Sequence, residues 1–312
     1  MKDLIKFSKL FYENKVSSGD EKALFDLIKN EVSSYEIKTD ALNNVILKKE
    51  GKNGKYIVFS THLDTAGFIA TYIDDKGRIK ICCADSFNAN ACANLPVSFF
   101  GGAKGILSAK SEEKIKNEDL FVDVFEKTKK NTEKKVSLGE GALIDVPMQK
   151  AGKNGFFGYG TSTAFLLGAF TGAIKRLQSK DGEYGTIFIL SAQRNLGARG
   201  ISPALFGIKA EKAFLFDSVS SEEDGLILKV KEKRAISDKV LLNEAQTVLR
   251  DNNIKYTPLV FSEGEGELNA FLSCGIPAVE IDLPAKNFGT AVELISAQDA
   301  KNVENAIVSL AL

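Results

Sequence analysis

Helix-like and strand-like patterns alternate through the second half of the chain, and this alternation constrains the possible folds more than any other feature. Downstream of Gly158, stretches with apolar residues at helical spacing are followed in turn by short runs rich in β-branched and aromatic residues. The predicted helices are 162–178, 199–206, 238–251, 267–273 and 298–311, and the predicted strands are 185–191, 209–217, 256–260 and 278–282. We therefore expect an α/β sheet layered by helices.

The N-terminal part of the chain also has helix and strand patterns, and a stretch of a different kind separates it from the second half. The N-terminal part reads as helices at 3–14 and 19–33, followed by strands at 44–48 and 56–60. Residues 67–150 instead contain short alternating runs between glycine-containing turns, which is typical of a small β-rich module. The 312 residues are thus predicted to form a discontinuous α/β domain, 1–66 and 151–312, with a β-barrel-like domain inserted at 67–150.

The charge balance gives no indication of a polyanionic partner. Lys and Arg total 41, as do Asp and Glu, so the whole-chain field that attracts proteins to nucleic acids or anionic membranes is absent. The lysine-rich stretch 110–135 also contains glutamates and is interpreted as a solvated face.

The longest uncharged run, 154–174, contains five glycines and reads as a glycine-rich loop entering a buried helix rather than as a membrane span. Because the N-terminus lacks an apolar signal-peptide core, we expect a cytoplasmic protein with no nucleic-acid and no membrane partner.

The cysteines are predicted to be structural. Cys82, Cys83, Cys92 and Cys274 form no Cys-x-x-Cys spacing, and adjacent residues of a strand point to opposite faces, so the first two cannot easily chelate one ion together. We expect buried thiols in a reducing compartment.

A single histidine, His62, limits the possible chemistry. Centres that need several imidazoles, such as a three-histidine zinc site or an HExxH helix, are excluded. His62 and Asp64 share one face of an extended segment, where the carboxylate can fix the histidine tautomer. By itself this pair favours a structural hydrogen bond over a functional site. Polar residues also end two other predicted strands, at Asp217 and at 191–195, which suggests one shared site at the edge of the sheet.

These segments resemble the dinuclear-metal aminopeptidases that assemble into tetrahedral dodecamers, a family that includes glutamyl and deblocking aminopeptidases and members mislabelled as endoglucanases. Residues 62–68 resemble the family's His-Met-Asp-Glu-hydrophobic-Gly-Phe segment, and 120–123 its aromatic-Ile-Asp strand. Residues 193–200 resemble Gln-Glu-Glu-Val-Gly-Leu-Arg-Gly, and 275–293 resemble Gly-Ile-Pro followed by Pro-Thr-Arg-Tyr-Ile-His-Ser-Pro-Val-Glu. The likeness covers nearly the whole chain. It implies a layered αβα aminopeptidase domain of the phosphorylase/hydrolase-like kind, with an inserted domain that carries dimer contacts.

The resemblance also shows which functional positions have changed. In the family, one zinc is held by the histidine of this segment and by an aspartate that ends a later strand, and these match His62 and Asp217, with Asp64 behind the histidine. The bridging aspartate, the carboxylate ligand of the second zinc and the last histidine ligand are lost. These positions are Ser162, Asn195 and Gly289.

Arg194 stands at the position of the family's general-base glutamate, and a guanidinium cannot accept a proton. A zinc held only by His62 and Asp217 would have half of the usual tetrahedral protein ligands. We therefore expect a catalytically inactive homologue with no cofactor, or at most one weakly bound divalent metal at the ancestral zinc or cobalt site. Its role would be to bind a peptide ligand or to act as a scaffold in a homo-oligomer, a dimer or larger. The alternative is an active metal-dependent aminopeptidase with an altered single-metal site.

The unmatched acids in this region predict a further contact. Arginine pairs well with carboxylates through its planar fork of N–H donors. We expect Arg194 to occupy the vacated metal region and to pair with Asp217 or a neighbouring acid.

Overall fold

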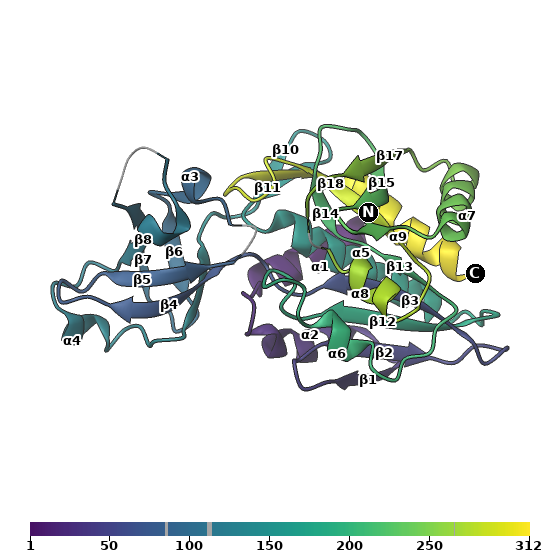
Figure 1. The fold of residues 1–312 in the computed structure, drawn as a ribbon, viewed down its shortest axis with the longest axis horizontal. Coiled ribbons are helices and arrows are strands. Elements are labelled where there is room, and N and C mark those ends of the chain that lie inside the picture. The colour runs from purple at the N-terminus through teal and green to yellow at the C-terminus, as the bar shows by residue number, and fades with distance from the viewer. Residues whose placement is uncertain (85–86, 111–113, 265) are drawn as a thin grey trace.

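The computed structural model describes residues 1–312 apart from 85–86, 111–113 and 265. Figure 1 shows a large α/β body and, to its left, a smaller β-rich body. This is the predicted α/β architecture with an inserted barrel.

A mixed 13-stranded sheet forms the centre of the large body, in the order β1-β2-β12-β3-β13-β18-β19-β11-β10. Four neighbouring central strands are parallel: β12 (Gly185–Ser191), β3 (Tyr56–His62), β13 (Lys212–Leu215) and β18 (Ala278–Lys286). They are buried along most of their length because both faces of the sheet are covered. The flanking strands are β1 (Glu36–Thr39), β2 (Val45–Lys49), β19 (Glu293–Ser296), β11 (Gly155–Gly158) and β10 (Gln149–Ala151). Four more strands branch beside β18: β14 (Ser218–Ser220), β15 (Leu226–Glu232), β16 (Ala235–Ile236) and β17 (Tyr256–Phe261).

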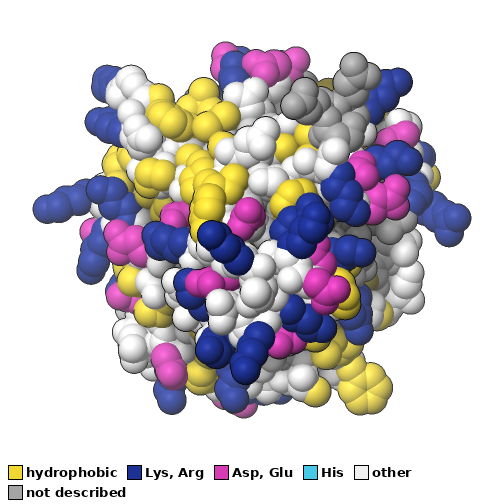
Figure 2. Space-filling view, turned by 90° about the vertical axis from the view of Figure 1, so that its left-hand side faces the viewer, with side chains coloured by type: hydrophobic (Ala, Val, Ile, Leu, Met, Phe, Trp, Pro, Cys, Tyr) yellow, Lys and Arg dark blue, Asp and Glu magenta, His cyan; other side chains and the backbone are white. Residues whose placement is uncertain are grey.

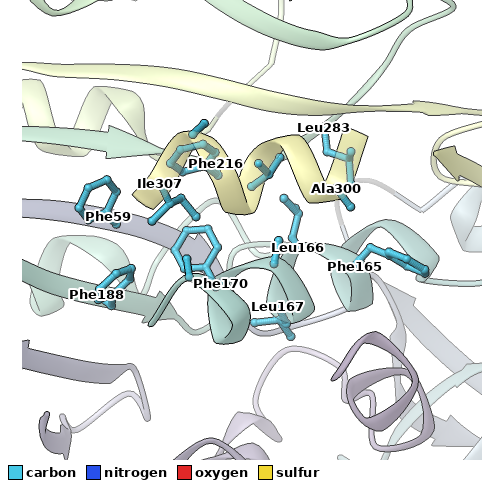
Figure 3. Close-up of a cluster of buried hydrophobic side chains, with 14 of the residues drawn as sticks. Phe59, Phe165, Leu166, Leu167, Phe170, Phe188, Phe216, Leu283, Ala300 and Ile307 are labelled. Atoms are coloured by element: carbon cyan, nitrogen blue, oxygen red, sulfur yellow. The ribbon is translucent and has the colours of Figure 1, made fainter. Parts of the chain in front are cut away.

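The larger hydrophobic core lies between the sheet and one layer of helices. These helices are α1 (Lys2–Glu13), α2 (Phe25–Glu31), α5 (Thr161–Leu177), α7 (Lys239–Asp251) and α9 (Ala297–Ala311). In Figure 3, Phe170 of α5 lies among Phe59, Phe188 and Phe216. Helix α5 packs closely against α1 because it has glycine at 168, where a Cβ would lie 2.4 Å from the Ser8 Oγ.

The opposite face of the sheet carries a smaller core beneath two short helices, α6 (Ile201–Ala204) and α8 (Leu268–Ser273). A single 3-10 turn, η1 (Glu21–Leu24), precedes α2. Among the described residues, no helix is both long and apolar enough to cross a membrane.

The small body is a closed barrel with its own hydrophobic core. Its strands, in spatial order, are β4 (Phe68–Ile73), β5 (Ile79–Cys83), β8 (Leu120–Asp123), β7 (Lys104–Ala109), β6 (Pro96–Phe99) and β9 (Gly141–Ile144). Short helical turns join them: α3 (Ala89–Cys92), η2 (Asn117–Asp119) and α4 (Lys129–Thr132). The barrel ends at Ile144, and β10 already belongs to the large sheet; the domain limits at 66/67 and 150/151 stay predictions.

The described part of the lysine-rich stretch 110–135 is largely exposed, as in the pair of Lys135 with Glu126, while 111–113 fall outside the described residues. Figure 2 shows both signs of charge interspersed on this end of the molecule.

Two sequence expectations are wrong. Cys82 and Cys274 are exposed, and only Cys92 is fully buried. The strand alternation places Cys82 on the outside of the barrel, and Cys274 follows the end of α8. The predicted glycine-rich loop before α5 contains strand β11, because 155–158 pair with both β10 and β19.

Candidate functional site

Polar side chains from neighbouring strands meet at the carboxyl edge of the parallel sheet. Ser191 is paired with His62 in the register of β12 and β3. Leu215 is paired with Ser60 on one side and Glu280 on the other. Two residues further along, Asp217 therefore lies between His62 and the β18 residue Asp282, all on one face of the sheet.

His62 is held between two carboxylates. Its Nδ1 lies 2.8 Å from the backbone oxygen of Asp64 and 3.7 Å from the carboxylate of that residue, and its Nε2 lies 3.3 Å from Asp217 Oδ1. Burial alone would lower the pKa of the imidazole, but the charge and hydrogen bond of Asp217, followed by Asp64, raise the pKa of His62 to about 10. The imidazole therefore favours its protonated form between the two carboxylates, and a metal ion would have to displace a proton to bind a ring nitrogen.

Arg194 binds the other oxygen of Asp217. Its Nε and Nη2 both lie 2.8 Å from Asp217 Oδ2, and the Ser218 N–H donates to Oδ1 over 2.7 Å. Burial would raise the pKa of Asp217, but the Arg194 and His62 charges hold that pKa well below its ordinary value. The expected pairing of Arg194 with Asp217 is present.

Asp64 fixes the backbone of the loop that carries Arg194. Its carboxylate accepts hydrogen bonds from the N–H of Arg194 (3.0 Å), from the N–H and side-chain amide of Asn195 (2.9 and 3.1 Å) and from the Ser18 hydroxyl (2.6 Å). Although burial opposes ionisation, the hydrogen bond and charge of His62 together with these donors lower the pKa of Asp64 to about 2. The loop begins at Gln193, whose φ of 55° lies in the left-handed region.

All remaining predicted site positions meet at one small cavity of about 70 Å³. Its lining includes His62, Asp217, Arg194 and the three positions of the lost ligands, Ser162, Asn195 and Gly289. Glu293, to which we assigned no role from the sequence, also lines it. Its carboxylate accepts hydrogen bonds from the Ser162 hydroxyl (2.8 Å) and the Gly289 N–H (3.2 Å), and burial raises its pKa.

A second cluster of buried charges, centred on Lys229, lies near Asp217. The sequence alone does not predict it. Lys229 Nζ lies 3.1 Å from Glu232, 2.6 Å from Glu280 and 3.1 Å from Asp282, and all four residues are less than a tenth exposed. Burial would lower the lysine pKa, but Asp282 and Glu280 raise it. Burial raises the pKa of Glu280 and of Asp282. The available sequence signal was charged residues inside the apolar strands β15 and β18.

The donor set does not fit the zinc or cobalt that the sequence resemblance implies. The Asp217 carboxylate already contacts Arg194 and His62 and accepts a hydrogen bond from a backbone N–H. The three positions of the lost ligands in the same cavity carry a hydroxyl (Ser162), an amide (Asn195) and no side chain (Gly289). No three His, Cys, Asp or Glu side chains of the described ranges form a group suited to a metal ion.

Comparisons with known proteins agree with this architecture. The sequence profile of the M42 glutamyl aminopeptidases matches residues 43–305. A putative aminopeptidase of Acetivibrio thermocellus is 27% identical, over 93% of each chain. The TET1 peptidase of Pyrococcus horikoshii has a similar fold, with a TM-score of 0.90 at 20% identity over 99% of both chains. An aminopeptidase from the archaeon Desulfurococcus kamchatkensis superposes equally well, with a TM-score of 0.90 at 19% identity over 99% of this chain and 94% of that one.

The profile match spans most of the chain, and the fold and the order of the site segments agree with it. The chain therefore belongs to the M42 glutamyl aminopeptidase family.

Proposed function

We propose that this chain does not hydrolyse peptides and serves as a non-catalytic subunit of a homo-oligomer. The observation that carries the proposal is the contact of the Arg194 guanidinium with Asp217, 2.8 Å from the same oxygen through two nitrogens. In this arrangement a protein cation neutralises the carboxylate that would otherwise be free to bind a metal.

The residues at the family's catalytic positions support this proposal. Metal-dependent hydrolysis needs a metal-activated water and a carboxylate that accepts its proton. Arg194 cannot accept a proton, and the neighbouring Asp217 and Asp64 raise the pKa of His62. The oxygens of Glu293 are engaged by Ser162 and Gly289.

The size of the cavity favours a scaffold over a peptide-binding protein. Sites for small molecules have volumes of about 300–1,000 Å³, whereas this cavity measures about 70 Å³. The hydrogen bonds from Asp64 to the N–H groups of Arg194 and Asn195 oppose movement of one wall of this cavity, the loop at 193–195.

An oligomeric role is supported by a relative and by the surface of the barrel. The TET1 peptidase of Pyrococcus horikoshii assembles into a tetrahedron or a large octahedral shell. In this chain the inserted barrel exposes Phe125 (73%) and Leu138 (62%), and aromatic side chains such as Phe are enriched at protein interfaces. The barrel, 67–150, is therefore our proposed dimerisation domain.

Metal content and turnover test the catalytic part of the proposal. The purified protein is analysed for bound metal and assayed on aminoacyl-anilides with added Zn²⁺ or Co²⁺, with His62→Ala as the control. We expect substoichiometric metal and no turnover. Near-stoichiometric metal with turnover that His62→Ala abolishes would establish the alternative, an active aminopeptidase with a single-metal site.

A restored variant makes this test sharper. Arg194→Glu, Asn195→Glu, Ser162→Asp and Gly289→His together return the family's residue types to the cavity. If these four positions account for the loss of function, the variant gains metal binding.

The other expectation from the sequence is a peptide ligand. Such a ligand would raise the melting temperature of the unmodified protein without being cleaved.

A further inference from the structure

The first strand of the large sheet has a free edge. Among the described residues, β1 pairs only with β2. Asp40 N donates to Asn44 O across this ladder, and hydrogen-bonded residues alternate along an antiparallel pair. The peptide groups of Glu36 and Lys38 therefore face β2, and those of Ile37 and Thr39 face outward. The edge offers a row of backbone donors and acceptors for another strand.

The charges on the edge of one copy are complementary to those on the same edge of a second copy. Glu36 and Lys38 are exposed, and neither has an ion-pair partner in the described part of the chain. When two copies pair antiparallel about a two-fold axis at Ile37, each Glu36 lies opposite the partner's Lys38. The central residues then form a hydrogen-bonded pair, and the flanking pairs are the closer, non-hydrogen-bonded kind, in which side chains interact most strongly.

This register is also selective. Moving the axis by one residue in either direction, to Glu36 or to Lys38, would place like charges opposite one another, which is destabilising. The alternation of side chains would hold Ile37 on the core face of the sheet in both copies, since it packs against the main core here.

Among the described residues, no further strand continues the large sheet beyond β1. Figure 1 places β1 along the outer margin of the large body. One face beside it is open as a groove of about 490 Å³, lined by residues that include Lys38, Ile46, Ile187 and Phe206. Phe206, which lines this groove, is 93% exposed.

We propose that β1 pairs with β1 of a second copy across a two-fold axis at Ile37, so that the two sheets become one continuous sheet. The occupant is a second copy because the Glu-x-Lys order matches itself in this register. The proposal rests on the homo-oligomeric part of the proposed function and adds a contact separate from the barrel. The two grooves would then lie side by side on the same face.

Charge exchange at the edge tests the pairing. Sedimentation velocity and light scattering are measured for the unmodified chain, Glu36→Lys, Lys38→Glu and the double exchange, over a wide range of protein concentration. Each single change converts two opposite-charge pairs into two like-charge pairs, so we expect at least about a tenfold weaker association at this contact. The double exchange restores opposite charges and the original association.

Two further variants separate the edge from general effects of charge. Thr39→Pro removes an outward N–H without touching the β1–β2 ladder and is expected to weaken association as the single changes do. Glu13→Lys changes the net charge equally at an exposed residue of α1 and is expected to leave association unchanged.

The outcomes distinguish this inference from the proposed function. An oligomer whose mass is the same in Glu36→Lys, Lys38→Glu and Thr39→Pro as in the unmodified chain would overturn the edge pairing. The homo-oligomer of the proposed function would remain. Loss of assembly in both single variants without recovery in the double exchange would overturn the two-fold register. A chain that is monomeric at every concentration would overturn both the edge pairing and the scaffold role.

Discussion

Replacing Arg194 with methionine removes the guanidinium while keeping the length and apolar stem of the side chain. The Arg194 side chain is 22% exposed and that of Asp217 is 13% exposed, so the pair is only partly accessible to water. Removing one partner of a buried ion pair costs about 3–5 kcal/mol, because the remaining charge is uncompensated. His62 and the Ser218 N–H still stabilise Asp217. We therefore expect Arg194→Met to lower the free energy of unfolding by about 2–3 kcal/mol.

The assay is urea denaturation at neutral pH for Arg194→Met, Asp217→Asn and the double variant. The double variant no longer contains the uncompensated carboxylate, so we expect a coupling energy of about 1–2 kcal/mol between the two sites. Arg234→Met is the matched control, since Arg234 is exposed and has no ion pair among the described residues, and it should change stability by less than about 0.5 kcal/mol. A cost below about 1 kcal/mol for Arg194→Met, or strict additivity in the cycle, would refute the reasoning.

Three other consequences can be measured directly. Lys229→Met leaves three carboxylates without their cation and should cost about 3–5 kcal/mol in urea unfolding, with a loss below about 1 kcal/mol contradicting the cluster. The pKa of His62 is raised from 6.5 to about 10 on folding, so its contribution to stability is complete below pH 6.5 and lost as the pH rises through 10. We expect this part of the pH dependence, at most about 1.4 kcal/mol per pH unit, to be missing in His62→Asn, and an unchanged slope in that variant would argue against a charged imidazole. Asp64→Asn should speed amide hydrogen exchange at Arg194 and Asn195, and exchange as slow as in the unmodified chain would exclude Asp64 as the group that orders the loop.

The sequence predicted those features that depend on local pattern and on the ends of parallel strands. Strands 68–73 and 185–191 were predicted with the limits seen in the structure. The meeting of His62, Asp217 and Arg194 followed from polar residues at the ends of apolar strands, because parallel strands present these ends at one edge.

Features that depend on pairing between distant segments could not be predicted. The sequence predicts a loop in place of strand β11 because the glycines there weaken any strand pattern, and β11 pairs with β19, which is far away in the sequence. The Lys229 cluster arises from the register of β15 on β18, which no local pattern reveals. The role of Glu293 likewise depends on its approach to Ser162 at the start of α5.

The hydrogen bonds of Asp64 fix the backbone conformation of the 193–195 loop through backbone N–H groups. This carboxylate holds the N–H groups of residues 194 and 195, which every residue except proline possesses. These two backbone contacts do not depend on which side chains stand at 194 and 195, although the Asn195 side-chain amide adds a further hydrogen bond to Asp64. A substitution at 194 or 195 other than proline would thus change the groups that face the cavity while leaving both backbone hydrogen bonds in place.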